Sequence, residues 1–86
     1  LEKNVFIQPN PFNESITINL PQTLTGLNLE VIIYDLNGRM IYNKTHSNIQ
    51  GVITIGNLST LEKAPYFLKI ANNETGFTVV KKIIKL

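Results

Sequence analysis

Residues 29–44 read LEVIIYDLNGRMIYNK, and this stretch decides the fold. It contains two runs rich in β-branched and aromatic residues, 29–35 and 39–44, on either side of a short turn sequence. An Asn-Gly pair between two such runs, here Asn37 and Gly38, is the strongest short-range signal for a β-hairpin, because both residues tolerate positive φ. The stretch therefore predicts two antiparallel strands joined by a tight turn.

Both faces of the first predicted strand are largely apolar. Leu29, Val31 and Ile33 share one face, because side chains alternate between the two faces of a strand. Ile32 and Tyr34 share the other face. We therefore expect this strand to lie centrally in its sheet.

Five further short β segments lie outside the hairpin, and the last two are expected to pair as a second hairpin. They span residues 5–7, 15–20, 51–56, 66–71 and 77–86. Residues 57–65 are expected to form a loop with one turn of 3₁₀ helix, and no segment has the period of an amphipathic helix. This pattern predicts an all-β fold, an immunoglobulin-like β-sandwich of about seven mostly antiparallel strands.

Length and composition allow one small folded domain, residues 1–86. With 43% hydrophobic and 16% charged residues, the composition differs from that of disordered and membrane-spanning chains. Cysteine is absent, which removes disulfides and thiolate metal sites. The chain does not begin with Met, so we expect a single domain cut from a larger protein.

The reactive side chains argue against catalysis. The chain has one histidine, His46, and one aspartate, Asp35, and no nucleophile-elbow pattern surrounds its serines. The glutamates are scattered singly, and no Asp-x-Asp run offers hard oxygen ligands to calcium. His46 is expected to be exposed, whereas the carboxylate of Asp35 is expected to accept backbone N–H bonds in the predicted turn. We therefore expect no enzyme activity, no metal, no cofactor and no small-molecule substrate.

Four segments carry a family resemblance through their order and spacing. They read PNPFN at 9–13, VIIYDLNGR at 31–39, YFLKI at 66–70 and KIIKL at 82–86. Together they resemble the type A C-terminal sorting domain of the type IX secretion system, and the resemblance covers nearly the whole chain. The motif residues are interpreted as mainly structural, with Phe12 closing one end of the sandwich and Tyr66 in the core. They are Pro9, Asn10, Pro11, Phe12, Asp35, Asn37, Gly38, Arg39 and Tyr66.

The resemblance implies a C-terminal secretion signal that itself catalyses nothing. Cargo proteins that carry such domains pass through the periplasm and end at the cell surface or in the extracellular space. The folded domain is recognised by the shuttle and translocon components of the outer-membrane type IX machinery. A sortase-like peptidase usually removes it during surface delivery. These components and this peptidase are the partners that the resemblance predicts.

The last predicted strand allows two interpretations. Its lysines, which form the single basic cluster of a chain of net charge +2, could be solvated gatekeepers that prevent edge pairing. Alternatively, the segment is a docking strip for an acidic, partly apolar receptor surface, through strand addition to an exposed edge. The resemblance favours the docking strip, with recognition residues Lys81, Lys82, Ile83, Ile84, Lys85 and Leu86. A basic cluster without interleaved aromatic residues predicts no nucleic-acid partner.

Other interpretations stay open from the sequence. A carbohydrate-binding or adhesion module appended to an extracellular enzyme is the main alternative, although sugar platforms use exposed aromatic rings and the chain has no Trp. Its tyrosines, Tyr34, Tyr42 and Tyr66, lie in predicted strands. A passive immunoglobulin-like spacer is a further alternative. The edge-prone segment 5–7 could also exchange between protomers, which would give a strand-swapped homodimer of the isolated domain.

Overall fold

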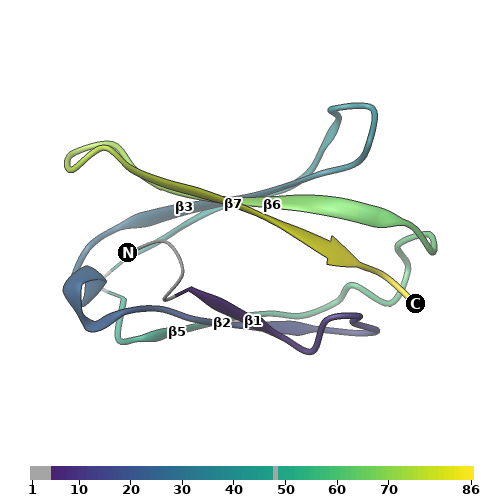
Figure 1. Cartoon of the computed structure of the whole chain (residues 1–86), viewed down its shortest axis with the longest axis horizontal. Helices are drawn as coiled ribbons and strands as arrows, with labels where there is room; N and C mark the ends of the chain where they lie inside the picture. The colour runs from purple at the N-terminus through teal and green to yellow at the C-terminus, as the bar shows by residue number, and fades with distance from the viewer. Residues whose placement is uncertain (1–4, 48) are drawn as a thin grey trace.

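The computed structural model describes residues 5–47 and 49–86, which form two antiparallel β-sheets packed face to face (Figure 1). The strands in chain order are β1 (Phe6–Gln8), β2 (Ile16–Asn19), β3 (Leu29–Tyr34), β4 (Met40–His46), β5 (Val52–Ile55), β6 (Pro65–Asn72) and β7 (Phe77–Ile84). The predicted all-β sandwich is confirmed. A 3₁₀ helix, η2 (Gln22–Leu24), is the one helix within the described residues, and its three residues are far too few to span a membrane.

The two sheets differ in size, and each contains a pairing between strands that are distant along the chain. The smaller sheet has the order β1-β2-β5, and the larger sheet has the order β4-β3-β6-β7. Strand β3 is central, as its two apolar faces predicted. The hairpins β3–β4 and β6–β7 both form as predicted, and β3 also pairs with β6, which is distant along the chain. Strand β7 consequently lies at one edge of the larger sheet and β4 at the other.

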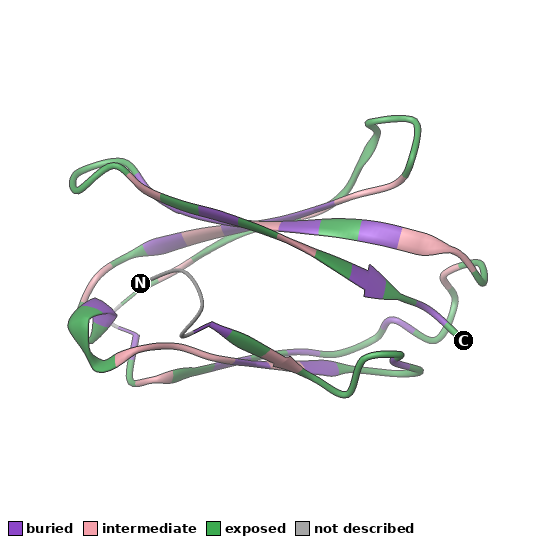
Figure 2. Cartoon of the chain, viewed as in Figure 1, coloured by how far each residue is buried: buried purple, intermediate pink, exposed green. Residues whose placement is uncertain are grey.

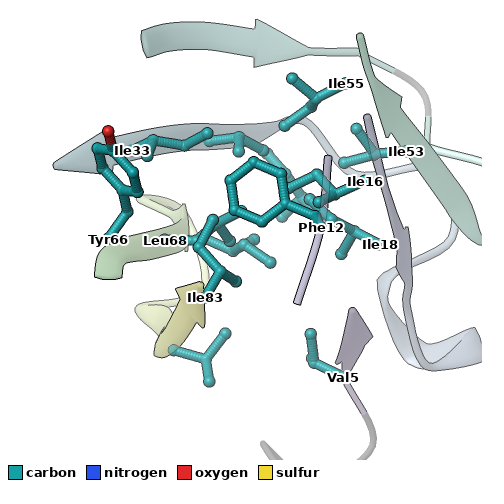
Figure 3. Close-up of a cluster of buried hydrophobic side chains, with 14 of the residues drawn as sticks. Val5, Phe12, Ile16, Ile18, Ile33, Ile53, Ile55, Tyr66, Leu68 and Ile83 are labelled. Carbon is teal, nitrogen blue, oxygen red and sulfur yellow. The ribbon is translucent and has the colours of Figure 1, made fainter. Parts of the chain in front are cut away.

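The hydrophobic core fills the space between the sheets, where the buried positions of Figure 2 face one another. The inner face of β3 contributes Leu29, Val31 and Ile33, which are fully buried. The side chain of Phe12 is also fully buried, and Figure 3 shows its ring pointing into the core cluster. Phe12 is therefore a core residue. The facing sheet and the neighbouring strands β6 and β7 supply most of the remaining buried side chains, among them Ile16, Ile18, Ile53, Ile55, Tyr66, Leu68, Ile70, Val79 and Ile83.

The turn between β3 and β4 forms where the Asn-Gly pair predicted it, with a different geometry. Gly38 has a φ of 84°, whereas Asn37 is not among the residues with positive φ. The N–H of Gly38 donates to the carbonyl oxygen of Asp35, and the N–H of Asp35 donates to that of Arg39. This is a three-residue loop with glycine in the left-handed position. It needs one residue with positive φ, whereas a two-residue type I′ turn needs two. The pairing register shifts next to it, between Ile33 and Tyr34.

The position of the 3₁₀ helix differs from the prediction. Within residues 57–65 the N–H of Leu61 donates to the carbonyl oxygen of Leu58, but this single turn does not extend into a helix. Asn57 precedes it with a φ of 60°, which is incompatible with a right-handed helix. The helix instead lies at Gln22–Leu24, directly after Pro21, where the apolar side chain of Leu24 is buried.

The expectation that His46 is exposed was wrong. His46 lies opposite Leu29 on the inner face of β4, so its ring faces the space between the sheets and is half-buried. Its Nε2 lies 3.3 Å from the hydroxyl of Tyr42, within hydrogen-bond distance. Burial, together with the nearby charge of Lys44, lowers the pKa of His46. The polar residues around His46 in the sequence did not indicate that its side chain would point inward.

Candidate recognition surface

The sandwich has one end at which the four motif segments meet, at the right of Figure 1, where the C-terminus also lies. Residues 9–12 hydrogen-bond to the end of β7. The N–H of Lys85 donates to the carbonyl oxygen of Ala64 at 2.9 Å, which joins the C-terminal segment to the loop before β6. That loop and the β3–β4 turn line a common groove. We call this region the motif end.

Asn10 clamps the outer edge of β7 through its side-chain amide. Its Nδ2 donates to the carbonyl oxygen of Lys82 at 3.1 Å, and its Oδ1 accepts the N–H of Ile84 at 3.0 Å. One amide side chain therefore satisfies a donor and an acceptor on the same strand edge, as a neighbouring strand would. Asn10 itself is exposed, so water competes for these bonds.

Phe12 continues the clamp with its backbone. Its N–H donates to the carbonyl oxygen of Ile84 at 2.8 Å, and its own carbonyl oxygen accepts the N–H of Leu86 at 2.9 Å. Phe12 and Lys85 form an isolated parallel bridge. The segment 9–12 thus crosses from the smaller sheet, where β1 pairs with β2, to the edge of the larger sheet. The buried ring of Phe12 fixes this crossing in the core.

The predicted recognition residues separate onto the two faces of β7 and its extension. Ile83 is fully buried and Lys85 is 6% exposed, because the alternation of β7 turns both toward the interior. The ammonium of Lys85 donates to the carbonyl oxygen of Leu86 at 2.9 Å. Lys85 is therefore neither a solvated gatekeeper nor an exposed residue of a docking strip. Lys82, Ile84 and Leu86 are exposed on the outer face, and Lys81 is half-buried on the inner face.

Two exposed apolar residues extend this outer face and were not among the predicted recognition residues. Val80 is 55% exposed on β7, and Phe67 is 37% exposed on β6, directly opposite Lys82 in the register. Ile84 is 42% exposed on the same face. We call Phe67, Val80, Lys82, Ile84 and Leu86 the outer patch. The signal for Phe67 was present in the sequence, because inward side chains at 66, 68 and 70 direct the side chain at 67 outward.

The lysines of β6 and β7 have no acidic partners within residues 5–47 and 49–86. In that part of the chain the one salt bridge joins Arg39 to Asp35. Lys69 and Lys82 lie on the outer face, and Lys81 lies at the same edge on the inner face. The outer patch therefore combines apolar side chains with uncompensated positive charge.

Asp35 organises the β3–β4 turn as predicted. Its Oδ1 accepts the N–H groups of Asn37 and Arg39, each at 2.9 Å, and its Oδ2 accepts from Nε of Arg39 at 2.8 Å. The backbone N–H of Arg39, together with its guanidinium, lowers the pKa of Asp35. The pairing also raises the pKa of Arg39.

Tyr66 lies beside this turn, at the base of a groove of about 330 Å³ between residues 35–41 and 60–66. Its side chain is 5% exposed, as predicted for a core residue, and its hydroxyl donates to the carbonyl oxygen of Glu62 at 2.8 Å. Such a bond from a buried tyrosine to the backbone a few residues upstream is a tyrosine corner, known from immunoglobulin-like sandwiches. Burial raises the pKa of Tyr66. The motif residues Asp35, Asn37, Arg39 and Tyr66 therefore meet around one groove.

The described part of the chain has neither a metal-binding cluster nor a fully exposed tyrosine. Within residues 5–47 and 49–86, no three His, Cys, Asp or Glu side chains gather where they could hold a metal ion. Tyr66 is buried, and Tyr34 and Tyr42 are half-buried, so none of the tyrosines presents a fully exposed ring. The described chain is a β-sandwich whose terminal strand is clamped by residues 10–12 and whose outer face exposes apolar side chains beside Lys82.

The family comparison agrees with this architecture. The family model of the secretion system C-terminal sorting domain matches residues 6–86. The chain therefore belongs to the C-terminal sorting domains of the type IX secretion system, a family of non-catalytic sorting signals. Membership gives it the role of a sorting signal for export to the cell surface or the extracellular space. No curated protein matches the sequence.

Solved structures confirm the immunoglobulin-like fold. A DUF3244 family protein from Bacteroides vulgatus with this fold matches 96% of the chain at a TM-score of 0.77 and 15% identity. PorZ, an essential bacterial surface component of the type-IX secretion system of Porphyromonas gingivalis, matches 98% at 0.75 and 17% identity. Dimeric latent PorU from Porphyromonas gingivalis matches 95% at 0.73 and 26% identity. The chain spans 84% of the DUF3244 protein but 12% of PorZ and 9% of PorU.

Proposed function

We propose that this domain is the C-terminal part of a larger secreted cargo protein and that shuttle and translocon components of the type IX machinery recognise it in its folded form. The observation that carries the proposal is the motif end. Residues 9–12 and 82–86 are more than seventy positions apart at Asn10 and Ile84, yet they hydrogen-bond to each other. A signal built this way is present in the folded domain and is lost from the unfolded chain.

The outer patch is the surface through which we propose that the domain is bound. Its exposed apolar side chains and the uncompensated Lys82 fit an acidic, partly apolar receptor surface. Ile83 and Lys85, which are buried, support this surface from beneath rather than contact the receptor.

Export of a reporter tests the proposal. A fluorescent protein with a periplasmic leader is fused to residues 1–86 and expressed in a host with a working type IX system. We expect fluorescence at the surface or in the medium, and retention in the periplasm when the translocon is inactivated. Retention of a folded fusion in the intact host would overturn the sorting role and leave a binding or spacer module.

A matched pair of variants tests the role of the outer patch. Ile84→Ser removes an exposed apolar side chain from the patch, and Val52→Ser removes one of similar exposure, 52%, from the edge of the other sheet. We expect I84S to reduce export and V52S to leave it unchanged. Equal export of both variants would exclude the patch as the recognition surface.

Removal of the domain by a sortase-like peptidase is part of the same proposal. The cut is expected near residue 1, upstream of β1, so that the whole sandwich leaves the cargo. Intact mass spectrometry of the exported reporter would show a product without residues 5–86. A reporter that reaches the surface with the domain still attached would contradict removal without affecting the sorting role.

A further inference from the structure

The outer edge of β7 is divided into a covered part and an uncovered part. Ile84 uses its N–H and its carbonyl oxygen for residues 10–12, so its backbone points to the outer edge. In an antiparallel pair, this orientation repeats at every second residue. The register of β7 with β6 is unbroken, so the backbone groups of Thr78 and Val80 point the same way.

The uncovered part has no partner strand within the described residues. The clamp from residues 10–12 reaches back only to the carbonyl oxygen of Lys82. Among residues 5–47 and 49–86 the sheet ends at β7, and no hydrogen bond joins the backbone of Thr78 or Val80 to described residues outside the β6–β7 pair. The segment from Thr78 to Lys82 is therefore an open edge of about 16 Å at roughly 3.3 Å per residue.

The regular register at this open edge distinguishes it from the other edge of the same sheet. Thr78, Val80 and Lys82 are exposed, and Val80 lies beside Phe67 on the outer face. At the opposite edge, β4 carries a register shift opposite Ile33 and Tyr34, and such irregularities protect edges from pairing. The edge of β7 is regular and has an apolar flank.

Charge indicates the chemistry of a strand that would pair here. Lys82 and Lys81 lie on opposite faces at this edge, and neither has an acidic partner within residues 5–47 and 49–86. A strand beside them would place its own alternate side chains next to these lysines. Acidic side chains at such positions would be stabilised, and lysines or arginines would be repelled.

We propose that a partner of the export machinery adds a short β-strand with acidic and apolar side chains to the edge of β7 at Thr78–Lys82, and that the segment 9–12 sets the end of this site. This inference rests on the proposed sorting function and specifies its mode of recognition. Backbone hydrogen bonds supply affinity in such strand addition, and the flanking side chains supply specificity.

Paired proline substitutions test strand addition in the reporter assay. Val80→Pro removes an N–H that points away from β6, and proline is tolerated at such edge positions. Asn43→Pro is the matched control, because the same alternation directs the backbone of the exposed Asn43 to the outer edge of β4. We expect V80P to lower export about tenfold, which corresponds to about 1.4 kcal/mol of binding free energy, and N43P to match the wild type. Thermal melts of both variants verify folding, and Thr78→Pro replaces V80P if V80P unfolds.

Charge reversal tests the acidic partner. Lys82→Glu is expected to lower export several-fold, while Lys44→Glu, which reverses an exposed lysine on β4, leaves it unchanged.

Export of the folded V80P or T78P variant at the wild-type level would overturn strand addition, and equal export of K82E and K44E would overturn the acidic partner. A concentration-dependent dimer of the wild type that V80P abolishes in sedimentation would assign the edge to a second copy and would also overturn the proposal. Absence of wild-type export would instead reject the sorting function itself.

Discussion

The two ends of the sandwich are each closed by an asparagine, and the two asparagines differ in burial. At the motif end, Asn10 is exposed and joins two segments that are distant along the chain. At the opposite end, at the left of Figure 1, Asn72 is 4% exposed and closes the β6–β7 turn. Its Oδ1 accepts from the N–H and the hydroxyl of Thr75, and its Nδ2 donates to the carbonyl oxygen of Asn28.

This difference in burial separates a residue that stabilises the fold from a residue that holds the recognition edge in place. A buried amide that loses its partners leaves unsatisfied groups inside the protein, whereas an exposed amide exchanges its bonds with water. Asn72 therefore contributes mainly to folding. Asn10 contributes less to folding, but it holds the edge at Lys82 and Ile84 in the form that a partner would meet. The motif therefore combines exposed residues such as Asn10, which position the motif end, with the buried residues Phe12 and Tyr66, which stabilise the fold.

The largest effect is expected from Phe12→Ala. Phe12 is fully buried, and large-to-small aromatic substitutions in cores cost about 3–5 kcal/mol. A domain of this length has a free energy of unfolding of roughly 4–13 kcal/mol, so F12A is expected to lose a large share of it. Urea denaturation followed by circular dichroism measures the loss. Ile49→Ala, at a buried position of the opposite end, is the control that separates a general core effect from detachment of the motif end.

Much of the fold that makes Phe12 a core residue could be predicted from the sequence. Alternation alone placed Leu29, Val31 and Ile33 on one face of a central strand, and the structure buries all three. Turn chemistry placed Asp35 correctly as an acceptor of backbone N–H groups. These predictions succeeded because they depend on neighbouring residues and on a period of two.

The arrangement of the motif end could not be predicted in the same way. The clamp joins Asn10 to Ile84 through one side-chain amide and an irregular segment, and neither has a periodic signature. Both interpretations of the last strand treated Lys85 like Lys81 and Lys82, yet its position in the alternation of β7 turns it inward and buries it. Lysine rarely becomes buried, and at this position the period of the strand outweighs the residue type.

Asn72→Ala tests the opposite end, with the second largest expected effect. The substitution removes three hydrogen bonds and leaves the carbonyl oxygen of Asn28 without the amide that it accepts from. We expect a loss of about 2–3 kcal/mol in the free energy of unfolding, measured by urea denaturation. Export of the reporter, corrected for the amount of folded protein, should stay at the wild-type level. A specific export defect would mean that the opposite end also contributes to recognition.

Asn10→Ala is expected to have the opposite combination of effects, a small loss of stability and a larger loss of export. It removes two exposed hydrogen bonds, so the loss in stability is expected to be about 1 kcal/mol. Reporter export should nevertheless fall more than in N72A, because the end of β7 is no longer held. Amide hydrogen exchange of Ile84 provides a direct check, since its N–H donates to Asn10 and should lose protection. Unchanged exchange in N10A would show that the clamp does not hold the edge.

The smallest effect concerns pH and the β3–β4 turn. Hydrogen bonds from Arg39 lower the pKa of Asp35 below its ordinary value of 3.8. A carboxyl group whose pKa is lower in the folded state stabilises the protein above its unfolded pKa, and this contribution disappears as the pH falls through the folded pKa. The urea midpoint of the wild type should therefore exceed that of Asp35→Asn at neutral pH, and the difference should shrink as the pH falls below about 4. The other carboxyl groups are common to both proteins, so parallel midpoint curves down to about pH 2 would show that this carboxylate does not stabilise the motif end.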